Sequence, residues 1–281
     1  MGDMQGSARR GVYGLGIDGL GTARHLMPVA DDSWPTLTVT TEVGGRTLEQ
    51  NSVTEEQARY RIETVDGEVR LDRANRTARF TMARVHDDQD FLHPFLALTG
   101  SVFAWWGGRE GFHAGAFVRR GRAWGVLGEQ GAGKSSVLAQ LHLAGTRVLT
   151  DDLLVVDDGV ALPGPSCIDL REGAAEHLGV GEHLGRVGAR VRYRLTLPPT
   201  ASPVRLAGWV VPGWNEGRST VSRVPAVQRL ALLGRHLSLY QTPTSAQRFL
   251  ELAALPVLAW HRPQRWVAAD DALAVLLDAT D

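Results

Sequence analysis

The sequence predicts an α/β fold that is built on a mixed sheet and carries a phosphate-binding loop. Three observations lead to this prediction. A glycine-rich turn separates an apolar run from an amphipathic run within residues 122–145. Apolar segments with strand character alternate with segments of helical period in the second half of the chain. Short turns such as Asp157-Asp158-Gly159 join some strands directly, so antiparallel pairs must occur beside parallel ones.

The glycine-rich turn reads GEQGAGKS and matches the Walker A pattern G-x-x-x-x-G-K-[ST]. Glycines let bare backbone N–H groups approach phosphate oxygens, and a helix that begins near Lys134 adds the positive end of its dipole. Lys134 supplies a charge for the β- and γ-phosphates, and the Ser135 hydroxyl is a ligand for Mg²⁺. ATP or another NTP, with Mg²⁺, is therefore the expected cofactor. The residues predicted to bind it are Gly128, Glu129, Gln130, Gly131, Ala132, Gly133, Lys134, Ser135 and Ser136.

Lysine usage supports this interpretation. The chain contains 30 lysine and arginine residues, and Lys134 is the one lysine among them. A chain that uses arginine at its other basic positions keeps lysine where a compact ammonium on a flexible stem is needed. The alternative is a glycine-rich turn between a strand and a helix that binds no ligand. The motif, its context and the lysine together favour the nucleotide site.

Length and composition restrict the class of protein. A chain of 281 residues can form one large domain or two small ones. We expect a β-rich N-terminal region over 1–108, with an apolar helix near 87–106, and a P-loop domain over 109–281. A formal net charge of −1 argues against electrostatic binding to nucleic acid or to a membrane surface. The single cysteine, Cys167, fits a reducing compartment, and no apolar run reaches the roughly 18 residues of a membrane span. A cytoplasmic location is expected.

Short strands and turns are expected in the N-terminal region. The strand candidates are 10–17, 37–43, 59–65, 69–71 and 76–83, and the last three are expected to form a meander. Residues 87–106 change to a helical period, with Phe91, Phe95 and Val102 on one face. We interpret these side chains as a buried helix stripe, although a ligand platform is the alternative. Pro94 either kinks this segment or marks an early turn of its helix.

The second half of the chain contains more apolar strands. We expect hairpins over 115–127 and 153–162, and single strands over 148–150, 205–211 and 257–261. Helices are expected over 134–145, 172–178, 226–235, 245–254 and 270–277. The arginines near the end of the chain, such as Arg262 and Arg265, are interpreted mainly as solvated surface charges. Holding an acidic substrate or a purine is the alternative for them.

An acidic pair, Asp151-Asp152, follows the strand after the Walker helix, where ligands of such sheets bind. Phosphoryl transfer to a hydroxyl needs a carboxylate that takes the proton and an oxygen ligand for Mg²⁺. An acidic pair supplies both, and crowding should push the two pKa values apart. A solvated turn is the alternative, but the flanking VLT and LLVV favour a functional pair. By its spacing alone, His113 is more readily explained as structural, and the histidines show no spacing that predicts a zinc site.

These residues also carry a family resemblance. The segment HAGAFVRRGRAWGVLGEQGAGKSSVLAQLHLAGTRVLTDDLLVVD resembles the catalytic core of bacterial HPr kinase/phosphorylase. It resembles even more the serine kinases encoded with ribosomally made peptides, such as the lasso-peptide kinases. A histidine before the hairpin, the GEQGAGKSS loop and an Asp-Asp pair after the helix match in order. The resemblance extends weakly over GPSCIDLR.

The resemblance implies a role for each matched residue. Lys134 would bind the phosphates and Ser135 would bind Mg²⁺. Asp151 would take the proton of the acceptor hydroxyl, and Asp152 would support it or the metal. His113 would lie beside the acidic pair.

Further implications concern fold and substrate. Arg171, at the end of GPSCIDLR, would neutralise charge on the transferred phosphate. The implied fold is the phosphoenolpyruvate-carboxykinase-like mixed sheet. The implied reaction moves the γ-phosphoryl group of ATP to a hydroxyl, most often a serine of a peptide or small protein in a peptide-tailoring pathway. The glutamate-containing signature of HPr kinase has no counterpart after the Asp-Asp hairpin, so the second metal ligand is open.

Two other functions fit the same loop. A nucleotide-gated regulatory NTPase or binding protein would place water at the acceptor position. A nucleotidyl or pyrophosphoryl transferase would yield AMP where a kinase yields ADP. The sequence leaves open the acceptor, the choice between ATP and GTP, and the oligomeric state, a homo-oligomer included.

Overall fold

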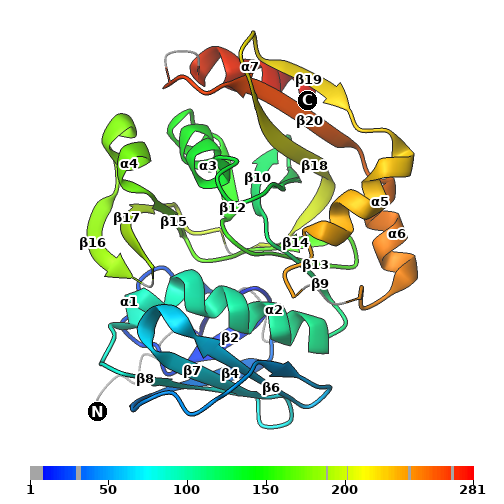
Figure 1. The fold of residues 1–281 in the computed structure, drawn as a ribbon. Helices are drawn as coiled ribbons and strands as arrows, with labels where there is room; N and C mark the ends of the chain where they lie inside the picture. Colours follow the sequence, from blue (N-terminus) through cyan, green and yellow to red (C-terminus); the bar gives the residue numbers. More distant parts are fainter. Residues whose placement is uncertain (1–8, 30–32, 188, 201, 240–241, 267–268) are drawn as a thin grey trace, which may run out of the picture.

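The computed structural model describes residues 9–29, 33–187, 189–200, 202–239, 242–266 and 269–281. These residues form a mixed α/β structure with three sheets, as the strand and helix patterns predict. Figure 1 shows the N-terminal sheet as the lower layer, with the helical segment 88–106 against it. The larger sheet and the remaining helices lie above this segment.

The N-terminal sheet is formed by residues 10–82 and mixes parallel with antiparallel pairs. The predicted single strand over 10–17 is wrong, because the chain reverses at Tyr13 and Gly14, both at positive φ (58° and 78°). The predicted strand over 59–65 ends at Ile62 and continues as a 3₁₀ turn, Glu63–Val65. In spatial order the strands are β3 (Met27–Pro28), β1 (Arg10–Val12), β2 (Leu15–Asp18), β4 (Thr36–Val43), β8 (Thr77–Met82), β7 (Gly67–Asp72), β6 (Gln57–Ile62) and β5 (Ser52–Val53).

The helical segment is broken once. It comprises α1 (Asp88–Asp90), η2 (Phe91–Phe95) and α2 (Leu96–Trp106). His93 is extended (φ −141°, ψ 127°) because the ring of Pro94 disfavours a helical residue before it. Phe91 packs edge-on against Phe80 of β8, with ring centroids 5.1 Å apart, and both are buried. The interpretation of the aromatic stripe as core is therefore confirmed.

The larger sheet is mixed, as predicted. Strand β11 (Arg122–Val126) runs parallel to β18 (Val204–Asn215), which runs parallel to β20 (Val257–Pro263). The other pairs are antiparallel. The remaining strands of the path are β12 (Arg147–Thr150) and β10 (Gly115–Arg119) on one side, and β14 (Val160–Leu162), β13 (Leu154–Asp157) and β9 (Glu110–Phe112) on the other, while β19 (Thr220–Arg223) pairs with β20.

Four strands of this sheet end at the same edge. Strand β10 is antiparallel to both β11 and β12, so β11 and β12 share one direction. Strands β18 and β20 share it too, because they pair in parallel with β11 and with each other. The segments that follow β11, β12, β18 and β20 therefore meet along one edge, which is where open α/β sheets bind ligands.

Helices and a small third sheet complete the structure. The predicted helices are present as α3 (Lys134–Leu143), α4 (Glu172–Leu178), α5 (Ala226–Arg235), α6 (Ala246–Ala254) and α7 (Ala269–Ala279). The antiparallel sheet β15 (Cys167–Leu170), β17 (Arg190–Thr196) and β16 (Glu182–Val187) was not predicted. Strands β16 and β17 bury one residue each, Val187 and Arg194, so they lack the apolar alternation that marks a strand. Among the described helices, none combines the length and apolar character of a membrane span.

The hydrophobic core crosses the expected boundary at residue 108. One cluster joins Val12, Phe80 and Leu96 to Leu153 and Val155 of the larger sheet. Two further clusters lie on the two faces of the larger sheet, one around Trp209 and α6, the other around α3 and α7. The N-terminal sheet and the larger sheet are thus separate sheets that share apolar packing.

Candidate active site

A strand, a glycine-rich loop and a helix follow one another at residues 122–143, as the Walker A pattern predicts. Gly128, Gly131 and Gly133 have φ values of 144°, 93° and 81°, which side chains with a Cβ rarely adopt. Lys134 is the first residue of α3, and its ammonium donates to the carbonyl oxygens of Gly128 (2.6 Å) and Glu129 (3.4 Å). The loop thus curves around a buried cation at the N-terminus of a helix, which is an arrangement that attracts anions.

Strand β12 places the acidic pair beside this loop. Asp151 is 3% exposed, and its Oδ1 accepts a hydrogen bond of 3.2 Å from the Ser135 hydroxyl. Asp152 is left-handed (φ 69°), so the two neighbouring carboxylates point to different partners. A Cβ on Gly115 would lie 3.0 Å from the Thr150 carbonyl oxygen and 2.3 Å from Leu138 of α3. Glycine at 115 therefore permits β10, β12 and α3 to approach closely where the pair is held.

The two carboxyl groups have opposite pKa shifts. Burial and the neighbouring Asp152 charge raise the pKa of Asp151 to about 6, against the opposing effects of His93 and Ser135. Burial alone would also raise the pKa of Asp152, but a hydrogen bond from His93 and the charges of His93, His113 and Arg192 hold it well below its usual range. The predicted separation of the two pKa values is present. One member of the pair titrates near neutral pH, and the other is ionised throughout the physiological range.

Two histidines approach Asp152. His113 Nδ1 lies 3.5 Å from Oδ1 of Asp152, at the mouth of the hairpin, and the His113 side chain is 49% exposed. Burial and the charge of Lys134 lower the pKa of His113, so it is neutral at pH 7. His93 Nδ1 lies 3.9 Å from Oδ2 of Asp152, and His93 is 1% exposed. The position of His113 beside the pair agrees with the family resemblance, whereas His93 was not predicted.

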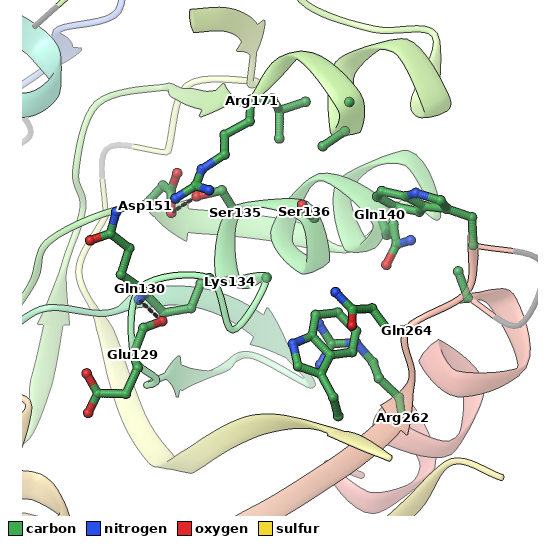
Figure 2. A pocket seen from close by; sticks show the side chains of 18 of the residues that line it. Glu129, Gln130, Lys134, Ser135, Ser136, Gln140, Asp151, Arg171, Arg262 and Gln264 are labelled. Carbon is green, nitrogen blue, oxygen red and sulfur yellow. Dashed lines mark hydrogen bonds between the residues drawn. The ribbon is translucent and has the colours of Figure 1, made fainter. Parts of the chain in front are cut away.

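A cavity of about 470 Å³ lies over the loop. Figure 2 shows Asp151 and Gln130 on one side of Lys134 and Ser135, Arg171 reaching down from above Ser135, and Gln140, Gln264 and Arg262 on the other side. Its size is within the usual range for small-molecule sites. Of the predicted residues, those that line it are His113, Glu129, Gln130, Gly131, Gly133, Lys134, Ser135, Ser136, Asp151, Asp152 and Arg171, whereas Gly128 and Ala132 do not.

Cationic side chains form one wall of the cavity. Arg171 precedes α4, Arg190 begins β17, and both line the cavity with Asp152. Burial and the charges of Arg171 and Arg192 lower the pKa of Arg190. Such a wall can neutralise phosphate oxygens opposite Lys134.

Arg262 is a buried cation, so it is an exception among the arginines that we expected to be mostly solvated surface charges. It is 6% exposed, and its guanidinium lies over the rings of Trp214 (4.1 Å) and Trp260 (4.4 Å). Its Nη2 donates to the Ala132 carbonyl oxygen at 3.2 Å. Arg262 thus braces the loop from the end of β20.

Several lining residues come from segments that carry no recognisable motif. Arg190, Trp214 and Trp266 line the cavity and lie well after the acidic pair in the sequence, whereas His93, which approaches Asp152, lies about 60 positions before it. One feature of the sequence could have indicated the tryptophans. Trp214 and Trp266 lie at or after the ends of apolar strands, where open α/β sheets bind ligands.

The oxygen donors at the acidic pair suit Mg²⁺. The Ser135 hydroxyl and the two carboxylates are hard oxygen ligands, and Mg²⁺ uses one or two such groups together with waters and phosphates. Within the described ranges, no group of three or more His, Cys, Asp or Glu residues forms a metal-binding cluster. The Ser135 hydroxyl and a carboxylate could therefore supply part of the oxygen shell of Mg²⁺, with phosphate oxygens and waters supplying the rest.

No protein-family model matches the chain, and no curated protein does either. Among solved structures, the chain is similar to the HPr(Ser) kinase/phosphatase from Coxiella burnetii. The two share 10% sequence identity, and the match covers 61% of this chain and 96% of that chain with a TM-score of 0.31. A likeness of this size supports no functional assignment, so the assignment rests on the geometry of the site.

Proposed function

We propose that the protein is an ATP- and Mg²⁺-dependent kinase that transfers the γ-phosphoryl group to a hydroxyl, namely a serine of a peptide or small protein. One observation carries this proposal. A carboxyl group with a pKa of about 6, Asp151, lies 3.2 Å from the Ser135 hydroxyl of a Walker A loop, in the cavity that the loop lines. A proton acceptor at the phosphate end of a nucleotide site is what transfer to a hydroxyl requires.

Different residues would bind the phosphates, accept the proton of the hydroxyl and hold Mg²⁺. Loop N–H groups and the Lys134 ammonium hold the phosphates, and Arg171 with Arg190 faces them from the opposite wall. The acceptor hydroxyl gives its proton to the Asp151 carboxylate as its oxygen forms a bond to the γ-phosphorus. The bond from that phosphorus to the β-γ bridging oxygen breaks, and ADP leaves. Bound Mg²⁺, held by Ser135 and a carboxylate of the pair, would neutralise charge on the β- and γ-oxygens.

Asp152, His93 and His113 set the charges and hydrogen bonds around Asp151. Asp152 stays ionised between His93 and His113, and its charge raises the pKa of Asp151. His113 is neutral and half-exposed at the cavity, so it can hydrogen-bond the acceptor without repelling Lys134. The pair therefore keeps one carboxylate as base and the other as a fixed charge.

The test is a transfer assay with γ-labelled ATP and Mg²⁺ and a peptide-rich extract of the native cells, using wild type, Asp151→Asn and Asp152→Asn. We expect label on a peptide with wild type, and a loss of several orders of magnitude with Asp151→Asn while nucleotide binding is retained. Asp152→Asn should reduce transfer less, because Asp151 is still present.

Three results would contradict this proposal. Free phosphate as the one labelled product would indicate a regulatory NTPase, and AMP would indicate nucleotidyl or pyrophosphoryl transfer. Transfer that survives in Asp151→Asn and is lost in Asp152→Asn would assign the base to Asp152.

A further inference from the structure

Two tryptophans are exposed in the same cavity. The chain has eight tryptophans, all within the described ranges. Trp214 (40%) and Trp266 (37%) are exposed, whereas Trp34, Trp106, Trp124, Trp209 and Trp260 are buried and Trp105 is half-buried. Trp214 and Trp266 both line the cavity over the phosphate loop. Large indoles that stay exposed in a cavity mark a place where apolar or aromatic surface binds.

Each of these indoles has one face already covered by a planar cationic or imidazole group. The guanidinium of Arg262 lies 4.1 Å over the Trp214 ring. The His177 imidazole stacks on Trp266 at 4.3 Å with an interplanar angle of 17°. These contacts restrain both rings, and the face opposite each contact is the one on which another planar group can stack.

The tryptophans accompany residues that lie away from the acidic pair, because Trp214 stacks on Arg262 and Trp266 is two residues after Gln264. Ser136 and Gln140 are four residues apart on α3, so they share one helix face that leads away from the loop. Figure 2 shows Gln140 and Gln264 at this far end, with Arg262 below them and Asp151 at the opposite end. Trp214 is the penultimate residue of β18, and Trp266 follows β20. A nucleotide whose γ-phosphate faces Asp151 extends its base in this direction.

We propose that Trp214 and Trp266 form a slot for the nucleobase of the bound nucleoside triphosphate, with the Gln140 and Gln264 amides at its edges. This inference rests on the proposed nucleotide site and adds the residues that hold the base. A purine offers the larger stacking surface, and side-chain amides can hydrogen-bond the polar edge of either ATP or GTP. The slot lies opposite the acceptor, so binding of the base leaves the approach to Asp151 free.

The experiment measures binding of ATP, GTP and inorganic tripolyphosphate, each with Mg²⁺, by titration calorimetry. The proteins are wild type, Trp214→Ala, Trp214→Phe, Trp266→Ala and, as a remote surface control, Val227→Ala, which alters an 88% exposed side chain on α5. We expect each alanine variant at the slot to weaken ATP and GTP about 5- to 150-fold and to leave tripolyphosphate affinity unchanged. Trp214→Phe should recover most of the loss, and Val227→Ala should match wild type.

Tripolyphosphate has no base, so its binding distinguishes failure of the nucleobase slot from failure of the proposed nucleotide site. If Trp214→Ala and Trp266→Ala bind ATP as wild type does, or lose ATP and tripolyphosphate equally, the slot is wrong while the phosphate site stands. If wild type binds neither ATP nor tripolyphosphate, the proposed function itself fails, and the slot fails with it. Trp266→Ala serves as an independent test, because Trp214→Ala could also loosen the loop: Trp214 stacks on Arg262, which donates to the Ala132 carbonyl oxygen.

Discussion

Asp151 and Asp152 show how adjacent residues of one type acquire different chemistry. Asp151 is buried against Ser135, and burial raises its pKa to about 6. Asp152 turns away at positive φ toward His93 and His113, which hold its pKa well below the usual range despite burial. The difference therefore comes from backbone direction and partners, and the residue type contributes nothing to it.

The two pKa shifts predict that Asp151→Asn and Asp152→Asn change the free energy of unfolding in opposite directions. The prediction is for the ligand-free protein, measured in EDTA. A carboxyl group whose folded-state pKa is raised stabilises the protein below its unfolded pKa and loses that contribution as pH rises through the folded value. Asp151→Asn should therefore gain stability over wild type between pH 4 and pH 6, up to about 3 kcal/mol, because the pKa difference is about two at about 1.4 kcal/mol each.

Urea unfolding at a series of pH values checks this prediction, with Asp152→Asn as the matched control. The depressed pKa of Asp152 stabilises the folded state above the unfolded pKa, so Asp152→Asn should lose stability at pH 7 and recover as pH falls. Equal effects of the two substitutions at pH 7 would contradict the assignment of the two environments.

At the scale of elements, the site depends on four strands that share one direction. The loop follows β11, the acidic pair follows β12, Trp214 is the penultimate residue of β18, and Trp266 follows β20. Close packing of these strands needs small residues at particular positions. A Cβ on Gly125 would lie 2.5 Å from the ring of Trp209, its cross-strand neighbour, which is fully buried.

Gly125→Ala should destabilise the protein by about 1–3 kcal/mol, because the buried Trp209 ring cannot move aside without disturbing its neighbours. Gly234→Ala is the matched control, since a Cβ there has no neighbour within 4 Å and Gly234 lies within α5. It should stabilise by about 0.5–1 kcal/mol through its helix propensity. Thermal unfolding of both variants measures these changes in stability. A Gly125→Ala protein as stable as wild type would refute the packing argument.

At the scale of the whole molecule, the N-terminal region reaches the site. His93 lies in the segment between α1 and α2 and approaches Asp152, while Arg194 of β17 donates to the Gln89 carbonyl oxygen at 2.6 Å. Arg194 also pairs with the buried Asp169 at 2.7 Å. The N-terminal region therefore contributes charge to the acidic pair in addition to shared core packing.

His93→Gln should move the acid limb of kcat/KM to higher pH. The charge of His93 lowers the pKa of Asp151, so removing it raises that pKa above about 6, and the base is protonated at a higher pH. His86→Gln is the control, because His86 is a buried histidine of the neighbouring segment that contacts Asp90 instead of the pair. An unmoved limb in His93→Gln would limit His93 to a structural role.

The sequence by itself determined the features that depend on residues close to one another in the chain. The strand, glycine-rich loop and helix around Lys134 and most of the other helices were predictable, because motif spacing and helical period extend over only a few neighbouring residues. Strands β16 and β17 were not, since their side chains bury too little apolar surface to show alternation. The break between β1 and β2 depends on a tyrosine at positive φ, which no local propensity predicts.

Tertiary structure alone decided which distant residues share the cavity. Trp214, Arg262 and Trp266 join Lys134 and the acidic pair because parallel pairing of β11, β18 and β20 brings their ends to one edge. His93 approaches Asp152 from the N-terminal region, with which the larger sheet shares one core. It also set the opposite pKa shifts of Asp151 and Asp152, since burial and neighbouring charges arise only once the chain is folded. Pairing and burial are long-range properties, so a linear pattern cannot specify them.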